Sequence, residues 1–188
     1  MSLPKHKYLL TYRYSEIIYD LTFVFCASFV ALYRDKRTRE QMEQAARSGK
    51  QNIVEGVGQS ETSKKGEIKL LGVAKASLEE LLADYEDYLR RNDLPIWSKA
   101  DEKVERLQHY IYRISHLSNL SDLGDLKEKA KLPQKPEVAA NLLLTLCHVA
   151  TFLLSRQITK AESDFVSKGG FTEHLFKKRL DAKFKSLK

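Results

Sequence analysis

Apolar side chains recur along most of the chain at steps of three and four residues, with polar and charged residues between them. This is the period of an α-helix that buries one face. The pattern predicts a first helix that begins at Ser15, a good N-cap, and ends before the charged corner 34–39. A second helix is expected over 38–57, where the buried positions are mostly small and favour close helix packing.

The clearest pattern spans 63–91, where a leucine-rich stripe continues for more than seven turns before Asn92 and Pro95. A fourth amphipathic helix is expected over 98–117, capped by Ser98. Amphipathic helices joined by short connections are typical of an up-down bundle. We therefore expect an all-α protein whose residues 1–118 form an antiparallel up-down four-helix bundle.

The remaining third of the chain predicts a helical extension. Residues 119–135 combine leucines with Ser, Asp, Gly and Pro and are interpreted as a linker. Pro136 suits the first turn of a helix that ends before Gly169-Gly170. The first half of this helix is apolar on nearly every side, which predicts burial within the fold or between subunits. A basic segment with apolar residues on one side is expected over 171–188, so residues 136–188 form a suffix of helices.

Composition narrows the class of protein. The 188 residues include only 8 Gly and 4 Pro, which argues against sandwiches and barrels. Cys26 and Cys147 lie in apolar runs and are expected to be buried free thiols of a reducing compartment. No secretory signal is apparent, and the most apolar windows, 21–32 and 140–154, are shorter than the ~20 residues that span a bilayer. A cytoplasmic protein without a membrane partner is the expectation.

The net charge of +7 favours anionic partners. Residues 133–188 hold ten basic and five acidic side chains, and further cations crowd the corner after the first helix. Such clusters suit phosphate contacts, and nearby Phe side chains suit base stacking. The alternatives are a solvated helix face, a membrane surface or a protein partner. The candidate nucleic-acid-binding residues are Arg34, Lys36, Arg37, Arg39, Arg47, Lys50, Lys177, Lys178, Arg179, Lys183 and Lys185.

Three strings of residues are specific enough to compare with a known family. They are Gln41-Met42 with Ala45-Ala46-Arg47-Ser48, then Asn52-Ile53-Val54-Glu55-Gly56-Val57-Gly58, and then Leu71, Ala74, Ser77-Leu78 and Glu80-Leu81. Together they resemble the signature of the bacterial four helix bundle protein family, over about residues 15–117. That family is encoded within intervening sequences of ribosomal RNA genes and includes the accessory variability determinant of diversity-generating retroelements. The segment from Leu154 to Glu173 looks like the suffix of a subset of these proteins.

The resemblance implies a homo-oligomer, pentameric in known relatives, with a nucleic-acid-binding surface and no catalytic residues. A reverse transcriptase and its template RNA are the partners it suggests. The chain departs from the family where Gly49-Lys50 replaces the frequent Ile-Pro pair, and it lacks the usual N-terminal Asp-Leu-x-Val-Trp pattern.

The sequence contains no phosphate-binding loop, zinc-protease, EF-hand or dinucleotide motif. His109 and His116 share a helix face but are seven residues apart, too far for a zinc pair without further ligands. Asn52 and Glu55, beside Gly56, form either a polar site at an interface or, better, a polar lock between helices. We expect no catalytic site, metal, cofactor or small-molecule substrate.

Two functions remain. The first is a non-catalytic, oligomeric adaptor that binds nucleic acid, with RNA favoured over DNA, and that acts as an accessory to a reverse transcriptase. The alternative is a structural homo-oligomeric protein–protein interaction module with no nucleic-acid role. They differ in whether binding to RNA is present and falls steeply with salt.

Overall fold

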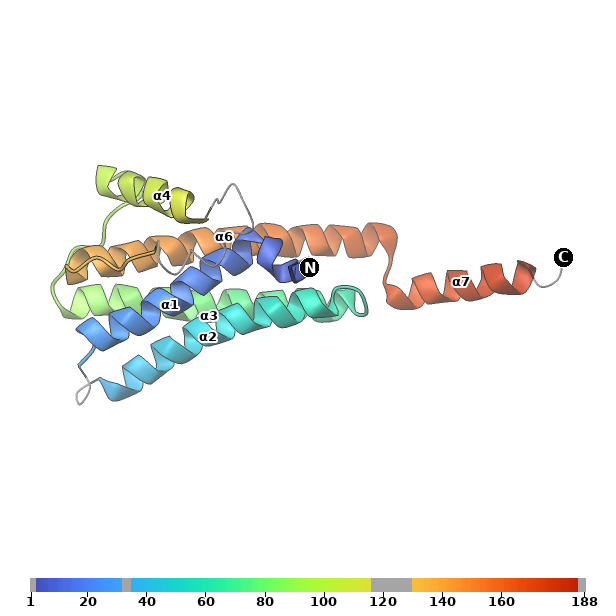
Figure 1. Ribbon diagram of the computed structural model, residues 1–188, viewed down its shortest axis with the longest axis horizontal. Coiled ribbons are helices and arrows are strands. Elements are labelled where there is room, and N and C mark those ends of the chain that lie inside the picture. Colours follow the sequence, from blue (N-terminus) through green and yellow to red (C-terminus); the bar gives the residue numbers. More distant parts are fainter. Residues whose placement is uncertain (1–2, 32–34, 116–129, 186–188) are drawn as a thin grey trace.

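The computed structural model describes residues 3–31, 35–115 and 130–185. These residues form helices and no strand, which confirms the expected all-α fold (Figure 1). The elements are the short 3-10 helix η1 (Lys5–Tyr8) and the α-helices α1 (Leu10–Phe29), α2 (Lys36–Gln59), α3 (Lys64–Arg91), α4 (Glu102–Ser115), α6 (Pro136–Lys168) and α7 (Phe171–Lys185).

Four long helices form an antiparallel up-down bundle. Each successive helix runs opposite to the one before it in the order α1, α2, α3, α6 (Figure 1). Around the bundle, α1 packs on α2, α2 on α3, α3 on α6, and α6 on α1. The core therefore lies between four helices, and α4 packs on the outside, mainly against α6.

The fourth helix of the bundle is α6, and the prediction that 98–117 takes this place is wrong. The reason is the distribution of apolar side chains. Every residue from Ala139 to Cys147 is buried, so α6 needs neighbours on several sides. The shorter α4 buries only one narrow stripe, at Val104, Ile111 and Ile114. The bundle thus extends past residue 118, and only α7 is an extension; most of the predicted linker 119–135 lies outside the described residues.

Aromatic side chains fill one end of the core. Phe25 of α1 packs edge-on against Tyr85 and Tyr88 of α3, with ring centroids 5.2 and 4.8 Å apart. The Tyr85 hydroxyl lies 2.8 Å from that of Thr22, and both residues are fully buried. This hydrogen bond satisfies the polar end of a tyrosine that otherwise contributes apolar surface to the core.

Helix boundaries test the predicted caps. The predicted start of the third helix at 63 is confirmed, and the structure adds that the Ser63 hydroxyl caps α3 by accepting a hydrogen bond from Gly66 N–H at 3.0 Å. Ser15 is not a cap, since α1 begins at Leu10 and the Ser15 hydroxyl donates to Tyr12 O inside the helix. The predicted end of α6 is correct, and Gly169 follows it with φ 76°, a left-handed conformation that favours glycine.

A polar clamp fixes the α3–α4 connection to the start of α6. Asn141 accepts a hydrogen bond from Trp97 N–H (2.9 Å) and donates one to Pro95 O (3.0 Å). The Trp97 indole N–H donates to Glu137 at 2.8 Å, and Lys103 lies over the indole ring. Asn141 is almost completely buried, so the role of its side-chain amide is to hold the α3–α4 connection against α6 through these hydrogen bonds.

One helical stretch, within Pro136–Lys183, contains an 18-residue window long and apolar enough to span a membrane. This differs from the expectation drawn from the shorter window 140–154. Two-thirds of the longer window (67%) is buried inside the protein, where α6 packs against α1 and α3. A helix that is buried in a helical core needs the same apolar composition as this 18-residue window.

Candidate nucleic-acid interface

The two predicted basic clusters lie at opposite ends of the molecule. Lys36 and Arg37 are in the first turn of α2, whereas Lys177 and its neighbours are in α7, beyond the far end of the bundle (Figure 1). The 24 residues of α2 alone span about 36 Å. A single chain therefore does not bring the two clusters onto one surface.

Most cations of α2 already have partners within the chain. Arg39 Nε lies 2.8 Å from Glu43, in a partly buried ion pair, and Lys36 lies 3.8 Å from Glu40. Lys50 sits over the ring of Tyr19, with Nζ 3.6 Å from its centroid. These contacts weaken the predicted phosphate surface on α2, because each ammonium or guanidinium group must leave a partner to bind a phosphate.

Two further predicted residues of this cluster have different surroundings. Arg47 is exposed on the outer side of α2. Arg37 lines a groove that also holds Glu40 and Glu80. Arg34 lies outside the described residues.

The α7 cluster is fully exposed. All five predicted cations there stand on a helix with no buried residue among its described side chains. With Glu173 and Asp181, the helix has a net charge of +3. The cations are Lys177, Lys178, Arg179, Lys183 and Lys185. Such a helix presents positive charge to solvent along its whole length.

The sequence analysis places the apolar residues of 171–188 on one side of a helix. In the structure, the apolar residues of α7 lie on two different faces. At 100° per residue, Phe171 and Leu175 lie close together, and Phe176 and Leu180 lie together on a different face. These four side chains are between 39% and 61% exposed, with Phe176 the most exposed. Phe176 is therefore positioned beside Lys177 and Arg179 for contact with an unpaired base or an apolar partner.

The signature residues on α2 have unequal roles. Asn52 donates to the carbonyl and hydroxyl oxygens of Ser48, and the Ser48 hydroxyl lies 2.9 Å from that of Ser77 on α3. Gly56 is buried and faces α3, where an added Cβ would lie 3.3 Å from Leu70 Cβ. It lies inside α2, which continues to Gln59, two residues beyond the predicted end of the helix at 57. Glu55 is exposed.

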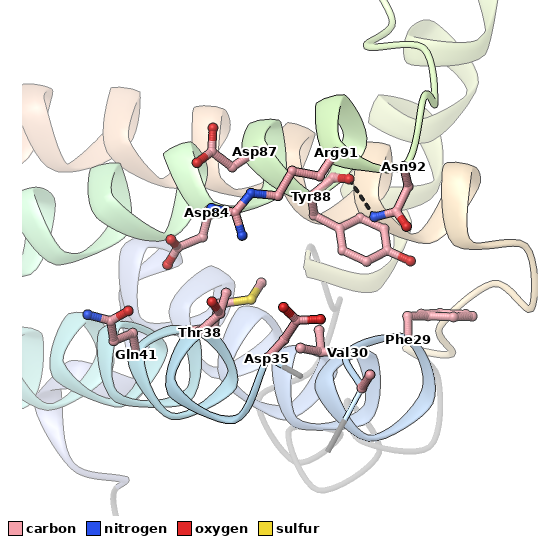
Figure 2. Close-up of a pocket in the computed structure, with 12 residues that line it drawn as sticks. Phe29, Val30, Asp35, Thr38, Gln41, Asp84, Asp87, Tyr88, Arg91 and Asn92 are labelled. Carbon is pink, nitrogen blue, oxygen red and sulfur yellow. Dashed lines mark hydrogen bonds between the residues drawn. The ribbon is translucent and has the colours of Figure 1, made fainter. Parts of the chain in front are cut away.

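A cavity of about 610 Å³ opens where the end of α1, the start of α2 and the end of α3 meet (Figure 2). Asp84 and Arg91 project into it from α3, and they are faced by Gln41 of α2 and by Asp35, the residue before α2. Burial and the nearby carboxylates of Asp87 and Glu80 raise the pKa of Asp84 to about 6. This half-buried carboxylate is thus destabilised as an anion near neutral pH and would be stabilised by a cation beside it.

An adjoining groove between α2 and α3, of about 920 Å³, is a feature that the sequence analysis missed. Ala45, Ser48 and Ser77 form its floor, with Glu40 on one wall and Glu80 on the other. The signal was present as small polar residues at positions where the helical pattern of α2 and α3 turns from buried to exposed.

The chemistry of the described residues offers no second kind of site. Within residues 3–31, 35–115 and 130–185, no group of three or more His, Cys, Asp or Glu is arranged to hold a metal ion. His109 is exposed near Glu105, and His116 lies outside the described residues. Cys26 and Cys147 are buried free thiols, as expected, and burial raises the pKa of both.

Comparison of the chain with protein-family models, with curated proteins and with solved structures gave no match.

Proposed function

We propose that this protein is a non-catalytic, homo-oligomeric adaptor that binds nucleic acid, with RNA favoured over DNA. The single observation that supports it most is α7, an exposed helix that carries five cations, two of which, Lys177 and Arg179, flank the exposed Phe176. Cations bind phosphates without regard to sequence, and an exposed aromatic ring stacks on unpaired bases. Unpaired bases are more common in RNA loops than in duplex DNA, which is why RNA is favoured.

Oligomerisation would raise the affinity of so short a helix. One α7 offers few phosphate contacts, but several copies on one assembly bind the same strand with a high effective concentration. The pentamer and the reverse transcriptase partner rest on the family resemblance alone, and the proposal does not depend on either.

The test is fluorescence anisotropy with a labelled RNA hairpin, its single-stranded form and a DNA duplex across a salt series. The variant K177A/K178A/R179A/K185A should weaken binding and flatten the plot of log affinity against log salt, by roughly 0.7 for each lost contact. A matched control, K65A/K69A/K99A/R113A, removes the same number of exposed charges from α3, α4 and the connection between them. Equal losses in both variants, or wild-type affinity indifferent to salt, would refute the proposal.

The exposed apolar side chains of α7 favour a second candidate, a homo-oligomeric protein–protein interaction module. Light scattering with and without RNA separates the two functions. A discrete oligomer whose mass is unchanged by RNA at any salt concentration would leave only the interaction module.

A further inference from the structure

Among the described helices, α7 carries the most exposed large apolar side chains: Phe171, Leu175, Phe176 and Leu180. Phe176 and Leu180, four residues apart on one face, are 61% and 39% exposed. Helices of globular proteins bury such a pair against another element. In the described part of the chain, no bundle helix lies along α7 (Figure 1).

The α6–α7 corner directs this helix away from its own bundle. Gly169 has φ 76°, and Gly170 N–H donates to the Glu173 carboxylate at 2.9 Å, which caps the start of α7. From this corner α7 extends about 22 Å beyond the end of the bundle. Its outer turns therefore reach no surface of the same chain, and a cover for Phe176 and Leu180 must come from another molecule.

The groove between α2 and α3 has the shape to accept a helix. Its floor consists of small side chains, Ala45, Ser48 and Ser77, which allow a helix backbone to approach closely. Its lining carries three carboxylates, Glu40, Glu80 and Asp84, and one cation, Arg37, so negative charge predominates. Asp84 and Gln41 face each other across the gap between α3 and α2 at the end of the groove (Figure 2).

The charges of the two surfaces are complementary. On α7, Lys177 and Arg179 flank the face of Phe176 and Leu180 on either side. In the groove, Glu80 forms no ion pair with residues 3–31, 35–115 or 130–185, and burial next to other carboxylates raises the pKa of Asp84. Cations docked beside these carboxylates would relieve their mutual repulsion.

We propose that α7 of one copy docks into the α2–α3 groove of a second copy of this chain. The contact joins two different surfaces, so it is heterologous and generates a ring or an open filament, in contrast to the two-fold pair of a symmetric dimer. Lys178 and Lys185 lie on the opposite side of α7 from Phe176 and Leu180, where they remain open to phosphate. The inference rests only on the oligomeric part of the proposed function.

Two full-length variants test the two surfaces separately. F176D/L180D removes the docking face of α7, and Q44K/E80K places cations in the groove; all four side chains are exposed, so the bundle should keep its helical circular dichroism. Each variant alone should give the 21.7 kDa mass of one chain by light scattering. The control Q108K/E162K makes the same charge changes at exposed sites on α4 and α6 and should keep the wild-type mass.

An equimolar mixture of the two variants is the decisive measurement. One intact groove then meets one intact α7, so the mixture should contain dimers of twice the chain mass and nothing larger. A monomeric wild type, which would indicate that α7 folds back on its own chain, overturns the proposal, as does a mixture that stays monomeric or a variant that keeps the wild-type mass. RNA binding is measured separately on K178A/K185A, whose side chains lie on the opposite side of α7 from the docking face, so a failure of RNA binding would leave this assembly intact.

Discussion

The Tyr85 hydroxyl donates a hydrogen bond to Thr22 Oγ1 inside the bundle, at 2.8 Å. The direction follows from the other contact of Thr22, whose own hydroxyl hydrogen is donated to Ile18 O at 2.6 Å. The two residues come from α1 and α3, so this bond joins helices that are far apart in the sequence. Burial also raises the pKa of Tyr85 well above its usual value, so the hydroxyl stays neutral.

This direction predicts unequal effects of two substitutions. Tyr85→Phe removes the donor and leaves Thr22 satisfied by Ile18, so the free energy of unfolding should fall by about 1 kcal/mol. Thr22→Val leaves the buried Tyr85 hydroxyl without an acceptor and should cost more, about 2 kcal/mol. Urea unfolding measures both, with the exposed Tyr112→Phe as control. An equal loss in the two variants would contradict the assigned direction.

Asp84 predicts an unusual dependence of stability on pH. Its pKa is raised from 3.8 to about 6, so the folded protein holds a proton there that the unfolded chain has lost between pH 4 and 6. The contribution of this group to stability therefore falls as pH rises through that window. Asp84→Asn should be more stable than wild type above pH 7, by about 1 kcal/mol after discounting for solvent, with no difference near pH 4.

Urea unfolding at pH 4, 5, 6 and 7.5 checks this prediction. Asp181→Asn, at an exposed position of α7, controls for the loss of one negative charge. A constant difference between D84N and wild type across the four pH values would show that the carboxylate does not titrate in this range.

Asn141 predicts a spectroscopic change at the single tryptophan of the chain. Asn141→Leu removes the bonds to Trp97 N–H and Pro95 O and should lower the free energy of unfolding by about 2 kcal/mol. The α3–α4 connection should loosen, so Trp97 fluorescence should shift to longer wavelength and become easier to quench with acrylamide. Gln108→Leu, which removes an exposed amide on α4, should change neither signal. An unchanged Trp97 signal in N141L would mean that Glu137 alone holds the indole.

Two glycines of α2 predict opposite effects of the same substitution. An alanine Cβ at Gly49 would lie 2.7 Å from Leu78 Cδ2, inside a core that cannot shift freely, so Gly49→Ala should destabilise the protein by about 1–3 kcal/mol. At Gly58 a Cβ meets nothing within 4 Å, and Gly58→Ala should stabilise the helix by about 0.5–1 kcal/mol. Thermal unfolding of both variants checks the pair, and stabilisation of both would show that α2 and α3 can separate at Gly49.

The sequence predicted helices better than it predicted their neighbours. The apolar stripe of α3 and its start at residue 63 are local features, and both are confirmed. Which helix completes the core depends on long-range packing. An apolar stripe such as that of α4 shows that one face is buried, but it does not indicate which helix covers that face. Ser15 misled for a related reason, because the polar residues before it are buried by tertiary contacts, such as that of Thr11 with Gln157.

The candidate site shows the same limit. The cations of α2 were visible in the sequence, and so were the glutamates four residues after Lys36 and Arg39 that pair with them. The exposure of α7 was not visible, since an apolar pair such as Phe176 and Leu180 ordinarily indicates a buried face. Nor does a sequence show that small residues of two helices form one groove floor.

The late position of α6 has a consequence for synthesis of the chain. The faces of α1 and α3 that pack on α6 have no cover until residues 136–168 leave the ribosome. Translation proceeds at about 5–20 residues per second, so several seconds separate the completion of α3 from that of α6. During that interval the nascent chain exposes an open apolar trough, the kind of surface that chaperones bind and that drives aggregation when ribosomes stall.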